Sequence, residues 1–128
     1  MEENYQQSFN CDPAFIMALK DSLNAVSGKW KLAIVCVLLT GKKRFSEIQR
    51  IVPTITPRMI SKELKELEIN GIISRNVINS IPVVIEYALT PSGRKLRDVI
   101  IVMVEWGILH REISLSSEKY NDDYIAVL

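Results

Sequence analysis

Residues 56–71 read TPRMISKELKELEING, and this stretch decides the fold of the chain. Thr56 is a good helix N-cap, and Pro57 suits the first helical turn because its φ angle is already close to the helical value. Gly71 is typical of the residue that follows a helix. The stretch therefore predicts a helix over residues 57–70.

This predicted helix has two different faces. Successive residues advance by about 100° around an α-helix, so basic side chains gather on one face and apolar side chains on the other. The basic face holds Arg58, Lys62 and Lys65, and the apolar face holds Ile60, Leu64 and Leu67. Such a helix can enter a DNA major groove while its reverse side is anchored in a core. The alternative is a solvated surface on which the basic residues pair with Glu66 or Glu68.

Three further helices are predicted on the N-terminal side. Pro13 and apolar residues at helical spacing indicate a helix over residues 13–26. The apolar run 30–39 is long enough for a second, central helix, in which Cys36 is expected to be a small core residue. Residues 42–44 form a basic connector, and residues 45–52 form a short third helix that ends before Pro53.

On the C-terminal side, the sequence predicts a hairpin and a long helix. Segments 72–78 and 83–89 are rich in Val, Ile and Tyr and flank Asn79-Ser80, which is typical of a β-hairpin. Thr90-Pro91 begins a helix that runs to about residue 114. A short helix, a turn, a capped helix and a hairpin in this order form a winged helix-turn-helix.

The predicted fold class is therefore mainly α with a small β-hairpin, a winged helix-turn-helix with flanking dimerisation helices. Residues 1–12 are expected to be a flexible segment, residues 13–114 the winged domain with its two dimerisation helices, and residues 115–128 a C-terminal tail.

The composition of the chain argues against a secreted or membrane-spanning protein. The N-terminus lacks the basic and apolar regions of a secretory signal, and the longest purely apolar run, 32–39, is too short to span a bilayer. A soluble protein of the cytoplasm without membrane contact is expected. The net charge is only +1, but residues 42–75 hold eight basic against four acidic residues. The positive charge thus lies where the helix-turn-helix is predicted.

Ten residues are predicted to contact double-stranded DNA: Arg44, Ser46, Thr56, Pro57, Arg58, Ser61, Lys62, Lys65, Arg75 and Asn79. Arg58 is expected to read a guanine edge bidentately, and Lys62 and Lys65 to meet phosphates. Thr56 and the free N–H groups of the first turn can also hold a phosphate.

Several motifs in order resemble the HxlR family, which belongs with the MarR-like winged-helix regulators. They are GKW at 28–30, RFSEI at 44–48, LKELE at 64–68, GII at 71–73, Pro82 with EYALT at 86–90, Gly93, and WG at 106–107. The resemblance covers roughly residues 11–112. It implies a cytoplasmic homodimer on a pseudo-palindromic operator, with residues 56–65 in the recognition helix and 76–84 in the wing.

The chain departs from the family pattern in two places. Val84 stands where members often have an Arg, and the wing tip carries no positive charge, so the wing is expected to contact the minor groove only weakly. Cys11-Asp12-Pro13 stands where many members have Cys-Pro, and some members sense oxidants or electrophiles through that cysteine. Cys11 is therefore a candidate redox sensor, and the alternative is an exposed thiol without a role.

The last predicted helix is apolar around most of its circumference, which indicates more than one partner surface. With the resemblance, this predicts a homodimer interface of Phe15, Leu19, Val99, Met103, Trp106, Gly107 and His110. The alternative is a monomer that buries this helix within one domain.

No catalytic chemistry is predicted. The single histidine, His110, has no partner at catalytic or metal-ligand spacing, and there is no glycine-rich phosphate loop. Neither a cofactor nor a metal is expected, and a small-molecule or oxidant effector is left open. The favoured function is a sequence-specific DNA-binding regulator. The alternative is a winged-helix module that binds another protein instead of DNA.

Overall fold

The computed structural model describes residues 11–116 and places the side chains of residues 11–114. The chain divides into two compact parts that meet between Arg94 and Lys95. Only residues 11 and 12 of the predicted flexible segment, and residues 115 and 116 of the predicted tail, are among those described.

Before the hairpin, the described residues of the first part form four helices, two of which begin at a side-chain cap. They are α2 (Pro13–Val26), α3 (Lys31–Leu39), α4 (Phe45–Ile51) and α5 (Pro57–Ile69). The Asp12 carboxylate accepts a hydrogen bond from the Phe15 N–H at 2.8 Å and caps α2. Thr56 Oγ1 accepts from the Met59 N–H at 3.2 Å and caps α5. All four predicted helices are confirmed, with ends that differ by at most one residue.

An antiparallel sheet of three strands follows the order β1-β3-β2, with β1 at Lys43–Arg44, β2 at Ile73–Ile78 and β3 at Val84–Leu89. The predicted hairpin is confirmed. The prediction that residues 42–44 are only a connector is wrong, because Lys43 and Arg44 pair with Tyr87 and Glu86 of β3. β3 is the central strand, and its edge away from β2 forms backbone hydrogen bonds with Lys43 and Arg44.

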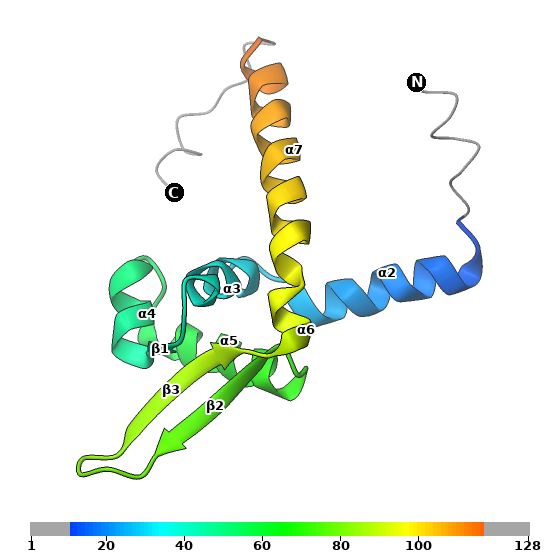
Figure 1. The fold of residues 1–128 in the computed structure, drawn as a ribbon. Coiled ribbons are helices and arrows are strands. Elements are labelled where there is room, and N and C mark those ends of the chain that lie inside the picture. The colour runs from blue at the N-terminus through cyan, green and yellow to red at the C-terminus, as the bar shows by residue number, and fades with distance from the viewer. Residues whose placement is uncertain (1–10, 117–128) are drawn as a thin grey trace. The chain divides into compact units, whose positions relative to one another are not determined.

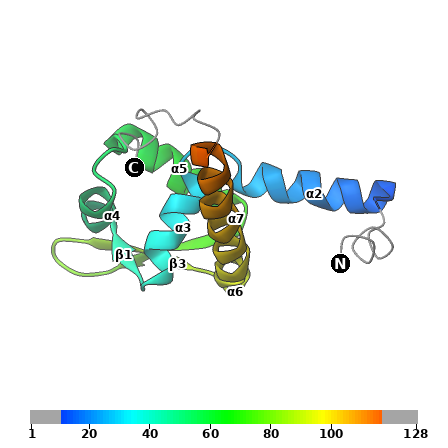
Figure 2. The ribbon, with the colours of Figure 1, turned by 90° about the horizontal axis from the view of Figure 1, so that it is seen from above.

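The core of the first part lies where α3 meets α4, α5 and β3, and Figures 1 and 2 show α3 in the midst of these elements. Its fully buried side chains come from α3, α4, α5, the start of β2 and the loop before α5; they are Ile34, Val35, Ile48, Ile55, Ile60, Leu64, Leu67 and Ile73. The β2–β3 hairpin projects beyond this core, and α2 has no buried residue. The fold is a winged helix-turn-helix, as the sequence predicts.

Two expectations for this region are wrong. Cys36 is exposed, although it lies in the central helix α3. Because α3 is apolar on every side, its pattern does not reveal which side faces water. The long helix expected from Pro91 is broken at Lys95 into α6 (Pro91–Arg94) and α7 (Leu96–Ser116). α6 belongs to the first part, where a Cβ on Gly93 would lie 2.1 Å from the Ile72 carbonyl oxygen.

The described residues of the second part form α7 and the preceding Lys95. Most of its aliphatic side chains are exposed, among them Val99, Val102 and Met103. Within residues 11–116, no helix alone meets the length and hydropathy needed to cross a membrane; α2 and α3 meet them only as a pair bent by 76°.

Candidate nucleic-acid interface

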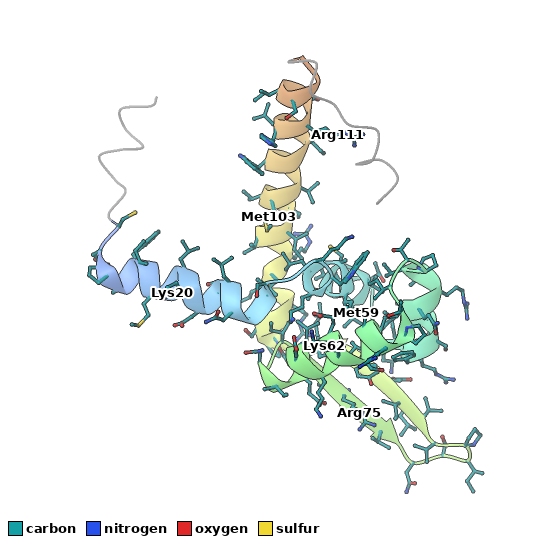
Figure 3. All side chains as sticks on the ribbon, turned by 180° about the vertical axis from the view of Figure 1, so that it is seen from behind. Lys20, Met59, Lys62, Arg75, Met103 and Arg111 are labelled. Atoms are coloured by element: carbon teal, nitrogen blue, oxygen red, sulfur yellow. The ribbon has the colours of Figure 1, made fainter. Side chains whose placement is uncertain are left out.

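The basic face of α5 points outward. Arg58, Lys62 and Lys65 are exposed, and no ion pair engages them among the described residues. On the opposite face, Ile60, Leu64 and Leu67 are at most 2 % exposed. Helical spacing thus separates the residues that hold α5 in the core from those that are free for a ligand, and Figure 3 labels Lys62 on this helix.

A buried lysine of α3 contacts a side of α5 that belongs neither to its basic face nor to its apolar face. Lys31, the first residue of α3, lies 2.7 Å from the Glu63 carboxylate, and its Nζ also donates a hydrogen bond to Glu66. Lys31 and Glu63 are each only 6 % exposed. Glu66 therefore pairs with Lys31 of another helix rather than with a basic residue of α5.

Ionisation of this cluster follows from its geometry. Burial by itself lowers the pKa of Lys31, but hydrogen bonds and charge attraction from Glu63 and Glu66 outweigh burial and raise the pKa above its usual value. The hydrogen bond from Lys31 lowers the pKa of Glu66. Lys31 and Glu66 are therefore both charged at neutral pH, and Lys31 offsets the negative charge of Glu66.

A hollow of about 310 Å³ lies between α5 and the hairpin. It brings together three residues predicted as DNA contacts, Ser61, Lys65 and Arg75, with Leu64, Glu68 and Tyr87. Sequence reasoning missed Tyr87, although its register opposite Arg75 would have placed it on the same face of the hairpin. The hollow joins α5 to the base of the hairpin.

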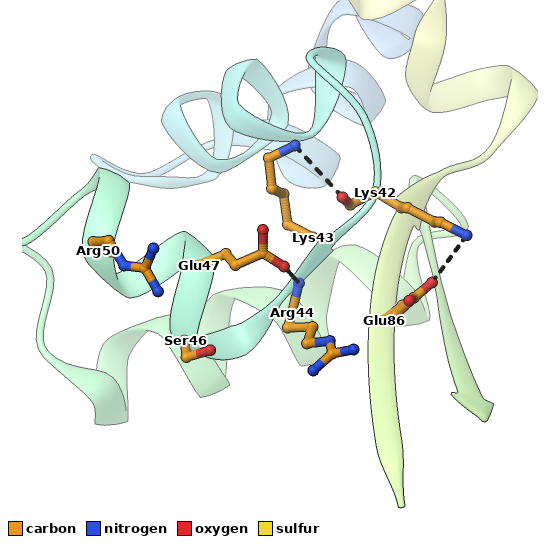
Figure 4. Close-up of a pocket in the computed structure, with 7 residues that line it drawn as sticks. All are labelled: Lys42, Lys43, Arg44, Ser46, Glu47, Arg50 and Glu86. Carbon is orange, nitrogen blue, oxygen red and sulfur yellow. Dashed lines mark hydrogen bonds and ion pairs between the residues drawn. The ribbon is translucent and has the colours of Figure 1, made fainter. Parts of the chain in front are cut away.

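A second, more open pocket of about 460 Å³ lies where β1, α4 and β3 meet (Figure 4). Its lining is mostly basic and comprises Lys42, Lys43, Arg44, Ser46, Glu47, Arg50 and Glu86. Glu47 accepts a hydrogen bond from the Arg44 N–H at 3.1 Å, and Lys42 pairs with Glu86 at 3.3 Å. Arg44 and Ser46 were predicted as DNA contacts. Lys42, Lys43 and Arg50 were not predicted as contacts, because the packing of β1 and α4 beside β3 decides which side chains share this pocket.

The hairpin tip presents neutral side chains. Asn79 is exposed, and the Ser80 hydroxyl donates to the Pro82 carbonyl at 2.7 Å. Ile81 is fully exposed. Of the predicted DNA contacts, Asn79 lies at this tip, apart from the residues of the two pockets.

A family model described as HxlR-like helix-turn-helix matches residues 25–114. The chain belongs to this family. The resemblance predicted from the motifs is confirmed, and the chain is a transcriptional regulator of the helix-turn-helix type.

Curated relatives of this HxlR-like chain carry matching descriptions. The HTH-type transcriptional regulator YybR of Bacillus subtilis is 42% identical over 100 residues, which are 78% of this chain and 79% of YybR. YtcD of the same organism is 40% identical over 94 residues, 73% of this chain and 75% of YtcD. Both are described as HTH-type transcriptional regulators of uncharacterised role.

Several solved structures of regulators are similar to this chain in sequence and in fold. The redox regulator HypR in its reduced form is 40% identical, with a TM-score of 0.72 over 77% of this chain and 98% of HypR. Reduced YodB of B. subtilis is 35% identical, with a TM-score of 0.64 over 76% of this chain and 91% of YodB. A MarR-family regulator of Enterococcus faecalis is 31% identical, with a TM-score of 0.68 over 85% of this chain and 97% of that protein.

In this HxlR-like regulator, the residues predicted to form a dimer interface are mostly exposed on α2 and α7. Phe15 and Leu19 are exposed on α2. On α7, the rings of Trp106 and His110 stack at 4.9 Å, and a Cβ on Gly107 would meet nothing within 4 Å. Leu19 of α2 and Val99, Met103 and Trp106 of α7 are about half exposed or more.

Both cysteines are exposed and free. Cys11 directly precedes Asp12, the N-cap of α2, so the neighbouring carboxylate is engaged in capping. Partial desolvation raises the pKa of the Cys36 thiol, which lowers the thiolate fraction at neutral pH. Cys36 is an accessible thiol that sequence reasoning missed.

Proposed function

We propose that this regulator binds a pseudo-palindromic operator as a homodimer, with α5 in the major groove of each half-site and the β2–β3 hairpin as the wing. The single observation that carries the proposal is the outward basic face of α5 on a helix whose other faces are held by the core and by Lys31. A rigidly held cationic helix can be positioned on phosphates and bases without first being ordered.

Within this arrangement each predicted contact has a role. Arg58, in the first turn of α5, reads a guanine through two hydrogen bonds, with Pro57 and Ser61 beside it. Lys62 and Lys65 bind phosphates, and so do the first-turn N–H groups next to Thr56. Further sugar–phosphate contacts come from the pocket of Figure 4 through Arg44 and Ser46, and from the wing through Arg75 and Asn79.

The dimer is proposed to form through α2 and α7. Phe15, Leu19, Val99, Met103 and Trp106 are at least two-fifths exposed in the single chain. Exposed aliphatic and aromatic side chains in such numbers are typical of surfaces that bind a second subunit. Gly107 and the stacked His110 complete this interface, in which the missing Cβ of Gly107 allows close approach.

Selection of bound duplexes from a random pool tests the proposal. We expect an inverted repeat whose half-sites are centred about one helical turn, roughly 10 base pairs, apart. Arg58→Ala should lose roughly 5- to 160-fold in affinity, about 1–3 kcal/mol, and should relax the preference at one base pair. Arg94→Ala, an exposed arginine of α6, is the matched control and should bind like the unchanged protein.

A protein-binding module is the competing function, and the uncharged wing tip favours it. The salt dependence of DNA binding distinguishes the two proposed functions. If the unchanged protein shows no affinity for DNA that falls steeply with salt concentration, the DNA-binding proposal is overturned and the module is favoured.

We further propose that Cys11 is the point at which oxidants or electrophiles act. Its thiol is exposed, and the solved relatives include HypR in an oxidised form and YodB in quinone-bound and diamide-treated forms. Diamide should change operator affinity in a Cys36→Ser variant but not in a Cys11→Ser variant. An equal response in both variants would contradict a role for Cys11.

A further inference from the structure

Three charged side chains meet where the start of α3 packs beside α5. Lys31 and Glu63 are each 6 % exposed, whereas the Glu66 side chain is 40 % exposed. The Lys31 Nζ lies 2.7 Å from the Glu63 carboxylate and donates a hydrogen bond to Glu66. One buried ammonium therefore holds two carboxylates, and the carboxylate of Glu66 is the one that reaches the surface of α5.

Glu66 stands at the border of the basic face of α5. It follows Lys62 by four residues, so the two side chains are neighbours on the helix, about 40° apart around its axis. The hydrogen bond from Lys31 is the largest cause that lowers the pKa of Glu66, and the positive charge of Lys62 lowers it further. Among residues 11–114, however, the ion pair of Glu66 is with Lys31 and not with Lys62.

We propose that Lys31 is a positioning residue for DNA binding, which holds the Glu66 carboxylate against the start of α3 and so leaves Lys62 free for a phosphate of the operator. The inference rests on the proposed function, in which Lys62, labelled on α5 in Figure 3, is a phosphate contact. Without Lys31, Glu66 would pair with the Lys62 ammonium one turn away and would repel the phosphate that Lys62 binds.

A purely structural role of the cluster predicts a different result. In that role Lys31 only holds α5 against α3, and its loss would lower stability and weaken every DNA contact of α5 together. In the proposed role the loss acts on one contact, that of Lys62, and through one carboxylate, that of Glu66. The two roles are separable, because Glu66→Gln removes that negative charge without returning the buried ion pair.

The test uses Lys31→Met, Glu63→Met, which we name the Met pair variant, and a duplex selected from the random pool. Replacing both partners of a buried pair with apolar residues is often neutral for stability. The variant loses one cation and one anion, so the net charge that attracts DNA at long range is unchanged. Glu66 is left ionised without its partner.

Affinity is measured over a series of salt concentrations. The Met pair variant should bind about three- to tenfold more weakly than the unchanged protein, because Glu66 then neutralises Lys62 and repels the phosphate. The slope of log affinity against log salt should become shallower by up to about 1, since fewer counterions are released. Adding Glu66→Gln to the Met pair variant should restore both the affinity and the slope.

Lys62→Ala, made in both proteins, gives the second readout. In the unchanged protein it should weaken binding about tenfold, since one charged contact is lost. In the Met pair variant it should cost less than about threefold, because Glu66 already engages Lys62. Glu68→Gln, at an exposed acid of the same helix outside the Lys31 cluster, is the matched control and should have the same effect in both proteins.

Circular dichroism establishes that each variant is folded. Should the Met pair variant fail to fold, Lys31→Gln, Glu63→Gln carries the same test, because it also removes one charge of each sign and its two amides can hydrogen-bond to each other.

Three results would overturn the inference. The first is a folded pair variant with the affinity and slope of the unchanged protein. The second is a loss that Glu66→Gln does not restore, or that Glu68→Gln restores equally, which would assign the cluster a structural role only. The third is an equal cost of Lys62→Ala in both proteins. If the unchanged protein shows no salt-dependent affinity for DNA, the proposed function itself falls, and this inference falls with it.

Discussion

Replacing Lys31 by Met tests whether the buried ion pair holds the recognition helix. Methionine keeps the unbranched stem of lysine and removes the ammonium group, so packing is largely preserved while the charge is lost. Glu63, which is 6 % exposed and 2.7 Å from Lys31, would then be left without its counterion. Removing one partner of a buried pair costs about 3–5 kcal/mol, which is a large share of the roughly 5–15 kcal/mol that stabilises a typical domain.

The assay is urea unfolding followed by circular dichroism at a single protein concentration, since the proposed dimer would unfold in a concentration-dependent way. The double variant Lys31→Met, Glu63→Met should recover most of the loss, because replacing both partners of a buried pair with apolar residues is often neutral. Lys42→Met is the matched control. Its lysine side chain is 70% exposed and pairs with Glu86 at 3.3 Å, and such a surface pair is worth at most about 1 kcal/mol.

The reasoning would be refuted by a Lys31→Met variant that loses no more than Lys42→Met. It would also be refuted by a double variant less stable than Lys31→Met alone, since the harm would then come from lost packing rather than from an uncompensated charge.

Three more predictions follow from single features of the structure. Gly93→Ala should lower the free energy of unfolding by about 1–3 kcal/mol, because the added Cβ would lie 2.1 Å from the Ile72 carbonyl oxygen. Ser92→Ala, at the exposed neighbouring residue of α6, is the control, and a stabilised Gly93→Ala would contradict the packing. Lys31 lowers the pKa of Glu66 below 4.5 in the folded state, so the stabilisation by ionised Glu66 is complete above pH 4.5 and disappears as the pH falls through the lowered pKa. The pKa of Lys31 is raised above 10.5, so the stabilisation by charged Lys31 is complete below pH 10.5 and disappears as the pH rises through the raised pKa. Urea midpoints across pH should show both losses in the unchanged protein and smaller ones in Lys31→Met. Met103→Asp, at an exposed residue of α7, should disrupt the proposed dimer and give a monomer in sedimentation, whereas a dimer that persists would exclude this face.

Local signals in the sequence determined most of the helices and the two faces of α5. Thr56 and Pro57 start α5 whatever surrounds them, because a cap and a fixed φ act within one turn. The apolar spacing of Ile60, Leu64 and Leu67 likewise predicted their burial, since helical periodicity needs no knowledge of the partner. The hairpin was predicted in the same way, from two β-rich segments around a turn.

The tertiary structure alone decided features that join distant segments. Lys31 and Glu63 meet only after α3 and α5 have packed, and a lysine at the start of an apolar run has the sequence signature of an exposed residue. β1 is a strand only because β3 lies beside it and pairs with it. Cys36 is exposed because no neighbouring element covers its side of α3, and the sequence of a helix that is apolar on every side does not show which side will be covered. Periodicity and caps describe one helix or strand at a time. Ion pairs between elements, strand partners and pockets depend on how the elements pack against one another, and this packing is decided by all their contacts together.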